Sequence, residues 1–313
     1  MTDLKFGLRQ MTKHPVFTAV AVITLALGIG ANTAVFSVVH AVLLRPLPYG
    51  DPDRLAWVWG ANPKNGIPHE TASAPDFLDW KDQNQVFQDM GAYHGLPAIL
   101  TGSEEPERFL GAATTPNLLP LLRVPPLMGR LFTDEDAKPG AVRVAILSHG
   151  LWQRRFGGDS SILGRTITLN GAPATVVGVM PAGFFLPVQS ASRHAEIITP
   201  LHLDPERMGR RSDFLGVIAR LRDGVTLQAA GTEMEGIAAR LAGQYPATNT
   251  NWSTIVLGLH ERFFGESRPV LRVLLGAVLF LLLIACANIA NLLLARAAAR
   301  RKELSIRAAL GAG

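Results

Sequence analysis

Two long uncharged segments constrain the fold of this chain more than any other feature of its sequence. Residues 16–44 and residues 273–295 are 29 and 23 residues long and contain no Asp, Glu, Lys or Arg. A helix of about 20 apolar residues crosses a bilayer, whereas a signal peptide has an apolar region of only about 7–15 residues. Buried helices of soluble proteins rarely extend so far without a charge. The sequence therefore predicts uncleaved transmembrane helices at 16–44 and 270–295.

Positively charged residues flank both predicted spans on the sides of the chain termini. Residues 1–15 carry three Lys or Arg, and residues 296–313 carry five. Because basic flanks remain in the cytoplasm, both segments are expected there, and residues 45–269 are expected to be extracytoplasmic. The formal net charge of +5 is explained by this juxtamembrane charge. Membrane lipid is therefore the expected partner of the basic residues, and nucleic acid is not.

The region between the spans, 45–269, is long enough to form a core of its own. Strand patterns occur at 55–59, 143–147, 214–221 and 252–259, and helical patterns at 73–80, 150–156 and 226–244. These elements do not alternate in βαβ order, which favours an α+β extracytoplasmic domain between two transmembrane α-helices. Two β-branched runs around Asn170-Gly171 predict a hairpin with a type I′ turn. The Pro- and Gly-rich stretch 180–212 is a candidate junction between two subdomains.

None of the short motifs that would give this chain chemistry is complete. Gly28 and Gly30 lack the third glycine of a dinucleotide fingerprint, and the glycine spacing at 158–165 is wrong for a P-loop. The histidines do not have the spacing of metal ligands on a helix. Ser148 belongs to no nucleophile motif and is a candidate helix cap. The sequence predicts no catalytic residue, no cofactor-binding residue and no metal site in this chain.

Small and amide side chains recur along both predicted spans. In the first span Ala26, Gly30 and Ala34 repeat every four residues, a spacing that lets two helices approach closely in lipid. In the second span Asn288 and Asn291 carry amides that need a partner in hydrocarbon. We predict that these residues face other helices; the alternative is that they are small residues on lipid-facing helices. Two spans are too few to surround the stripes, so a dimer, further spans or both are expected.

The basic segment 296–313 has the pattern of a short amphipathic helix. Glu303 and Arg307 are spaced i, i+4, which favours an ion pair on one helix face. The apolar side consists of Leu304, Ile306 and Leu310. Gly311 fits a helix stop. One interpretation is a segment that docks a cytoplasmic protein, and the other is a basic signal that only stops membrane transfer.

Several parts of the sequence resemble the MacB/FtsX-type ABC transporter permeases. The segment ELSIRAALGA at 303–312 resembles the motif after their second span, and 12–32 resembles their first span. The parts that are similar to their periplasmic core domain are 129–133, 147–157 and 178–181. Residues 32–48 are especially similar to the duplicated orphan permeases of Acidobacteria. The resemblance covers essentially the whole chain.

The resemblance implies a multi-pass permease subunit of the bacterial inner membrane, with a MacB-like periplasmic core domain at 45–269. A separate cytoplasmic ABC ATPase, which binds the ATP and Mg, is expected to dock on a coupling helix within 303–312. The second span would transmit the resulting motion to the periplasmic domain, for efflux, export or mechanotransmission. Further implied partners are a second copy or a paired permease half, a periplasmic adaptor and an outer-membrane channel.

The chain departs from that family at its C-terminus. The family has four spans in each core unit, whereas this chain stops after the second. Residues 296–313 are therefore expected to begin an incomplete FtsX-like permease domain in a truncated or partial reading frame. The alternative function is a two-span membrane sensor or scaffold with an extracytoplasmic ligand-binding domain. A sensor would need a signalling module, and only 18 residues follow residue 295.

Overall fold

The chain divides into two compact units, which are described separately. The structure, a computed structural model, describes residues 15–39, 47–102, 105–190, 193–265 and 268–309. The folded unit is Pro46–Gly265, and the helical unit joins Met1–Arg45 to Glu266–Gly313.

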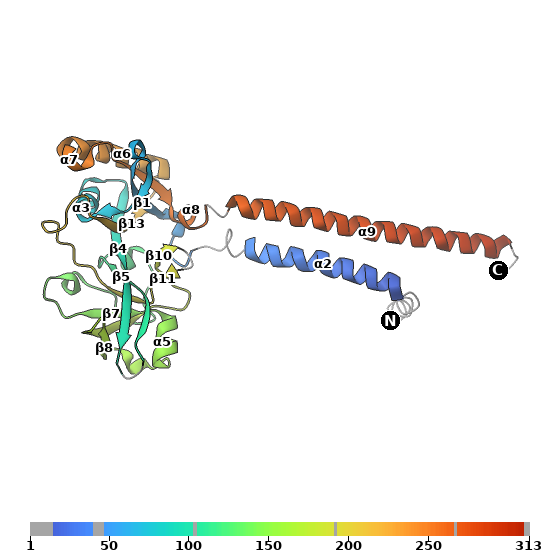
Figure 1. Ribbon diagram of the computed structural model, residues 1–313, viewed down its shortest axis with the longest axis horizontal. Helices are drawn as coiled ribbons and strands as arrows, with labels where there is room; N and C mark the ends of the chain where they lie inside the picture. The colour runs from blue at the N-terminus through green and yellow to red at the C-terminus, as the bar shows by residue number, and fades with distance from the viewer. Residues whose placement is uncertain (1–14, 40–46, 103–104, 191–192, 266–267, 310–313) are drawn as a thin grey trace. The chain divides into compact units, whose positions relative to one another are not determined.

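Two helices make up the described part of the helical unit (Figure 1). Helix α2 covers Pro15–Val39, and α9 covers Arg268–Ala309, 42 residues without a break. At 1.5 Å per residue α9 is about 63 Å long. The helices pack closely where both carry small residues, because a Cβ added to Gly28 would lie 3.2 Å from the Cβ of Ala285.

Within the described residues, one helix has the length and composition of a membrane span. It is the stretch Arg268–Asn291 of α9, with a mean hydropathy of 2.8. The apolar stretch found in α2 is shorter, Val22–Ser37. The predicted first span, 16–44, continues into residues that lie outside the described part, so it stays a prediction. No break in α9 marks the predicted end of the second span at 295.

A large mixed sheet forms the frame of the folded unit. Its strand order is β14-β1-β13-β4-β5-β12-β7-β9-β6, with β2, β3 and β8 paired at its sides. Most neighbours are antiparallel, and the parallel pairs are β12 with β5 and β7 with β9. The predicted α+β class is therefore confirmed for this unit.

The strands of the sheet are β1 Leu55–Asn62, β2 Ile67–Glu70, β3 Ala72–Ser73, β4 Phe87–Thr101, β5 Glu107–Thr114, β6 Met128–Gly129, β7 Val144–Leu147, β8 Thr166–Leu169, β9 Ala172–Val179, β12 Ile197–Pro200, β13 Asp213–Leu221 and β14 Ser253–Gly258. A separate two-stranded sheet consists of β10 Pro187–Ser190 and β11 Arg193–His194. The α-helices of the folded unit are α3 Ala74–Gln83, α4 Leu118–Leu121, α5 His149–Phe156, α6 Leu227–Gln244, α7 Pro246–Asn249 and α8 Leu259–Phe264. The 3-10 turns are Pro52–Arg54, Pro63–Asn65, Asp134–Ala137 and Ser160–Ile162.

Local sequence signals explain where several of these elements begin. The hydroxyls of Ser73, Ser148 and Thr226 accept hydrogen bonds from the backbone N–H groups three residues later, which caps α3, α5 and α6. Asn170 and Gly171 have φ angles of 51° and 75°, as a type I′ turn requires, and connect β8 to β9. The predicted cap at Ser148 and the predicted hairpin are confirmed.

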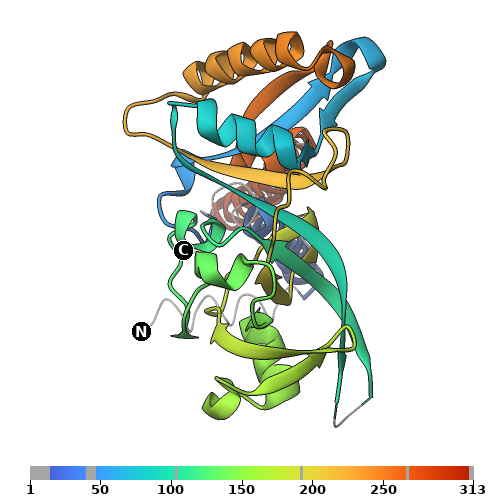
Figure 2. The same ribbon diagram turned by 90° about the vertical axis from the view of Figure 1, so that its left-hand side faces the viewer.

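The folded unit has two lobes that share the long strand β4 (Figures 1 and 2). In one lobe α3 and α6 cover one face of β1, β13 and the first part of β4. In the other lobe α5 packs on β7, β8, β9 and the end of β4. The stretch 180–212, the candidate junction between two subdomains, also contributes β12 to the middle of the sheet. Residues 201–212 alone return the chain from β12 to β13.

Candidate functional site

The predicted coupling segment continues α9 as a helix. Glu303, Leu304, Ile306 and Arg307 have helical backbone, which agrees with the i, i+4 spacing of the predicted ion pair. Leu310 and Gly311 lie outside the described residues. The coupling role of this segment stays a prediction.

The predicted packing residues of α2 lie on a different face from its contact with α9. Ala26, Gly30 and Ala34 are exposed, whereas Gly28 is buried against Ala285. Two residues along a helix rotate a side chain by about 200°, so Ala26 and Gly30 both point almost opposite to Gly28. The contact of α2 with α9 thus lies on the face opposite to these residues, and their packing against other helices stays a prediction.

Amide side chains of the two helices differ in their surroundings. The Asn32 Nδ2 donates a hydrogen bond to the carbonyl of Gly28 at 2.7 Å, within its own helix. Asn288 and Asn291 are exposed on α9. The exposed small and amide residues remain predicted contacts for helices beyond this pair.

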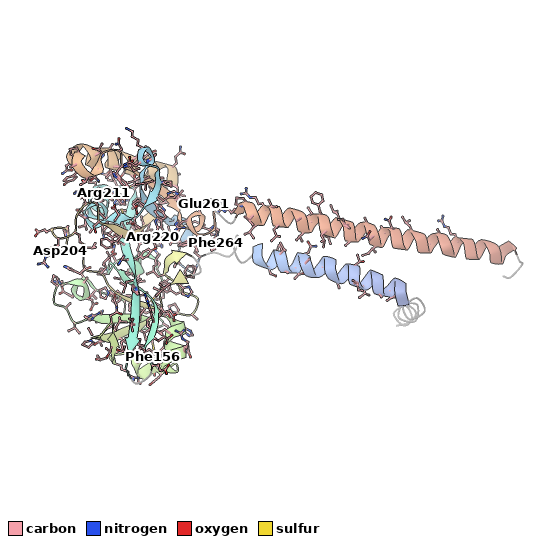
Figure 3. The ribbon with its side chains drawn as sticks, in the orientation of Figure 1. Phe156, Asp204, Arg211, Arg220, Glu261 and Phe264 are labelled. Atoms are coloured by element: carbon pink, nitrogen blue, oxygen red, sulfur yellow. The ribbon has the colours of Figure 1, made fainter. Side chains whose placement is uncertain are left out.

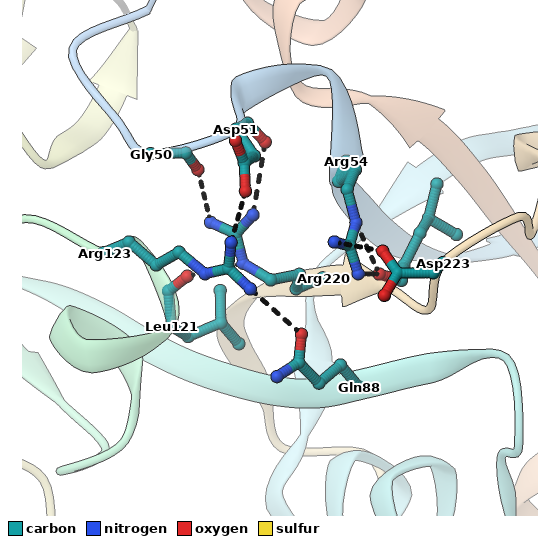
Figure 4. A network of polar contacts seen from close by, with 9 residues as sticks. Gly50, Asp51, Arg54, Gln88, Leu121, Arg123, Arg220 and Asp223 are labelled. Carbon is teal, nitrogen blue, oxygen red and sulfur yellow. Dashed lines mark hydrogen bonds and ion pairs between the residues drawn. The ribbon is translucent and has the colours of Figure 1, made fainter.

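The folded unit holds its first residues with a buried arginine. Arg220, on β13, is only 2% exposed. Its guanidinium donates to the carbonyls of Gly50 at 2.6 Å, Asp51 at 3.2 Å and Leu121 at 2.9 Å (Figure 4). Burial lowers the pKa of Arg220 to about 10, so the group is still charged at neutral pH. One side chain thus joins the segment 47–51 to α4 and to the central sheet.

A second arginine reinforces the same junction. Arg123 forms an ion pair with Asp51, and both residues have left-handed backbone, with φ angles of 54° and 47°. Such a conformation is unfavourable for residues other than glycine and persists only where surrounding contacts impose it. The N–H of Gly50 donates to the carbonyl of Leu122 at 3.0 Å. The segment 47–51 is therefore fixed by backbone and side-chain contacts together.

An aromatic cluster joins the first and last residues of the folded unit. The ring of Tyr49 lies 5.8 Å from that of Phe185, which lies 6.3 Å from that of Phe263 in α8. The Tyr49 hydroxyl donates to the carbonyl of Phe185 at 2.8 Å, and burial raises the pKa of Tyr49. Phe263 also packs edge-on against Trp57 of β1, at 6.1 Å. Phe185 is thus a shared neighbour of the segment 47–51 and of α8.

The sequence contains only a weak signal for this arrangement. Arg220 is the one charge within the otherwise apolar run LGVIARL, a sign that its charge has a buried partner. Tyr49 and Phe185 lie in segments without periodicity. Among the described residues no group of three or more His, Cys, Asp or Glu could hold a metal ion.

Comparisons with known proteins agree with this architecture. The MacB-like periplasmic core domain family matches residues 18–237. The ABC transporter permease YknZ of Bacillus subtilis (strain 168) is 26% identical over 185 residues, which are 59% of this chain and 44% of that protein. The macrolide export ATP-binding/permease protein MacB of Burkholderia lata is 24% identical over 181 residues, 57% of this chain and 25% of that protein.

A solved domain from Porphyromonas gingivalis has a similar fold, with a TM-score of 0.50 at 16% identity, over 67% of this chain and 93% of that chain. The chain matches less than half the length of either permease relative. The family match covers well over half of this chain and includes parts of both lobes of the folded unit. The chain therefore belongs to the MacB-like periplasmic core domain family.

Proposed function

We propose that this chain is a permease subunit, or part of one, of an ABC transporter in the bacterial inner membrane. The observation that carries the proposal is the family match over residues 18–237, in a chain whose folded unit is followed by a membrane-length apolar helix. In this proposal α2 and α9 cross the membrane, both termini are cytoplasmic, and the folded unit is periplasmic.

The energy for transport enters from another protein. A cytoplasmic ABC ATPase binds ATP and Mg, and its closure displaces the coupling segment at 303–312. In this proposal the ATP and Mg are bound by that partner and not by this chain. The uninterrupted helix α9 supports this role, because a helix without a kink carries a displacement along its axis.

The folded unit receives the motion through its two ends. Tyr49 and Phe263 contact the same ring, that of Phe185, so a displacement of α8 also acts on the segment 47–51. Arg220 passes that displacement on to β13 and α4. We propose that this serves export or mechanotransmission rather than passage of substrate between the helices.

Further partners complete the proposed assembly. The exposed stripe Ala26, Gly30 and Ala34, with Asn288 and Asn291, packs against a second copy or a paired permease half. A periplasmic adaptor and an outer-membrane channel are the proposed partners of the folded unit in a two-membrane cell. The charge of the flanking segments keeps them at anionic lipid.

Co-purification with the co-encoded ATPase tests the coupling role. We expect Arg307→Glu and Leu304→Asp each to reduce capture of the ATPase several-fold, because they reverse the charge and remove the apolar contact of the predicted helix. Arg207→Glu is the matched charge reversal on the folded unit, where the side chain is 87% exposed, and should leave capture unchanged. Undiminished capture of the ATPase by both Arg307→Glu and Leu304→Asp would refute the coupling role.

A further inference from the structure

Five half-buried aromatic side chains gather where the first and last residues of the folded unit meet. This aromatic patch consists of Trp59, Phe184, Phe185, Phe263 and Phe264. The ring of Phe263 lies 6.3 Å from those of Phe185 and of Phe264. Inner neighbours of the patch are the buried rings of Tyr49 and Trp57, which contact Phe184 and Trp59 at 6.2 Å and 5.4 Å. The patch is thus one connected surface whose inner side is the core.

A cation without a carboxylate lies within this patch. The guanidinium of Arg262 is 4.9 Å from the ring centre of Trp59 and 5.3 Å from that of Trp57. Its Nε is buried without a hydrogen-bond partner, and no carboxylate among the described residues forms an ion pair with it. By contrast, Arg54, Arg154 and Arg210 all have such a partner. An arginine held on aromatic faces in this way is suited to an anion such as phosphate.

Covalent connection limits how far this patch can be from α9. Residues 265–267 alone separate Phe264 from Arg268, where the apolar stretch of α9 begins. An extended chain advances at most about 3.6 Å per residue, so the two Cα atoms are within roughly 14 Å. Aromatic side chains with an apolar body are enriched at the membrane interface, next to the headgroups.

We propose that the aromatic patch rests in the headgroup region of the bilayer, with the Arg262 guanidinium on a phospholipid phosphate. The inference depends on the proposed function in one respect, because α9 must cross the bilayer. The lipid surface then supports the residues that join the folded unit to its helices. Motion of α9 acts on a domain seated on the membrane rather than on one held away from it.

Spin labels on the full chain in phospholipid nanodiscs test the proposal. In a Cys286→Ala background, Phe264→Cys, Phe184→Cys and Val142→Cys each provide a single labelling position. Oxygen concentrates in lipid and a nickel chelate stays in water. The ratio of the effects of oxygen and the chelate on the relaxation of a spin label therefore shows whether the label is in lipid or in water. Val142 is the control. It is 75% exposed and directly precedes β7, in the lobe that contains α5. The native Cys286, the one cysteine of the chain, reports separately whether α9 is in the bilayer.

We expect labels at 264 and 184 to have an oxygen-to-nickel accessibility ratio several-fold above that at 142. Position 184 keeps the test valid if Phe264→Cys fails to fold. If Cys286 is in lipid but 264 and 184 resemble 142, the proposed patch is refuted and the proposed function survives. If Cys286 is in water, both fail.

The role of Arg262 is tested on the same label. Arg262→Glu should lower the accessibility ratio at position 264 toward the value at 142, because a carboxylate is repelled by lipid phosphate. Arg240→Glu, a charge reversal on the exposed side of α6, should not change it. An unchanged ratio in Arg262→Glu would refute the phosphate contact.

Discussion

The guanidinium of Arg220 donates a 2.6 Å hydrogen bond to the carbonyl of Gly50, a residue 170 positions earlier in the chain. The same side chain reaches Asp51 and Leu121, so three carbonyls depend on one buried cation. Arg220 is labelled in the folded unit in Figure 3. Residues 47–51 are therefore held largely by tertiary contacts.

Replacing Arg220 with methionine should be strongly destabilising. Arg220→Met keeps an unbranched apolar stem but leaves three carbonyls without their donor, at an expected cost of about 3 kcal/mol. Arg222→Met is the control two residues later, where an exposed side chain makes one hydrogen bond to the carbonyl of Phe87. Urea unfolding of the full chain in detergent, followed by tryptophan fluorescence, measures both. Equal urea midpoints for Arg220→Met and Arg222→Met would show that the buried contacts of Arg220 contribute little to stability.

Gly50 should tolerate no side chain. A Cβ at this position would lie 2.6 Å from the Cβ of Arg123, whose backbone is already held in the left-handed region. We expect Gly50→Ala to lower the free energy of unfolding by about 2 kcal/mol. Gly209→Ala provides the comparison, because no atom lies within 4 Å of the added Cβ. Similar loss in both variants would contradict the packing explanation.

Asp213 should make the folded unit more stable in mild acid. Burial raises the pKa of Asp213 to about 6, despite the neighbouring Arg211. The folded state therefore binds the proton more tightly than the unfolded chain, and stability from this group rises as pH falls from about 6 to about 4. Asp213→Asn should remove this dependence and raise stability at pH 7 by roughly 1–3 kcal/mol.

The measurement is the unfolding midpoint of wild type and Asp213→Asn at pH 7, 6, 5 and 4. Asp136 does not interfere, because Arg130 lowers the pKa of that carboxyl to about 2 and its contribution is lost only below about pH 4. Parallel pH profiles for the two proteins would exclude Asp213 as the source.

The two faces of α2 should respond differently to a bulky residue. Gly30→Leu should weaken association between copies about tenfold, since it obstructs the exposed small-residue stripe. Gly28→Leu should leave that association intact and disturb the packing on α9, where Ala285 is in contact. Energy transfer between differently labelled copies in vesicles measures association, and the reaction rate of Cys286 reports the packing. If only Gly28→Leu loses association, the face of α2 that contains Gly28 joins the copies and the face that contains Gly30 does not.

Local patterns were sufficient wherever one short segment determines the outcome. Ser73, Ser148 and Thr226 are caps because each hydroxyl satisfies an N–H of its own helix, and Asn170-Gly171 turns without help from distant residues. The α+β class followed from the order of such segments.

Long-range contacts explain what could not be predicted. Strand β4 contains Gly91, Gly95 and Pro97, residues that weaken a strand pattern, and forms through its ladders with β13 and β5. Arg220 gave a sign of a buried charge, but its carbonyl partners come from segments that no spacing rule connects to it. The spacing of Ala26, Gly30 and Ala34 did not indicate the contact of Gly28 with Ala285, which lies on the opposite face of α2.

Strand β4 passes through both lobes, paired with β13 from Phe87 to Tyr93 and with β5 from Tyr93 to Leu100 (Figure 2). A hinge between the lobes would have to bend β4 itself near Tyr93, where its partner changes from β13 to β5. Hydrogen exchange along β4 should therefore proceed by one cooperative opening, with similar protection on both sides of Gly95. Because a single strand carries both ladders, we expect the two lobes to unfold together rather than one at a time.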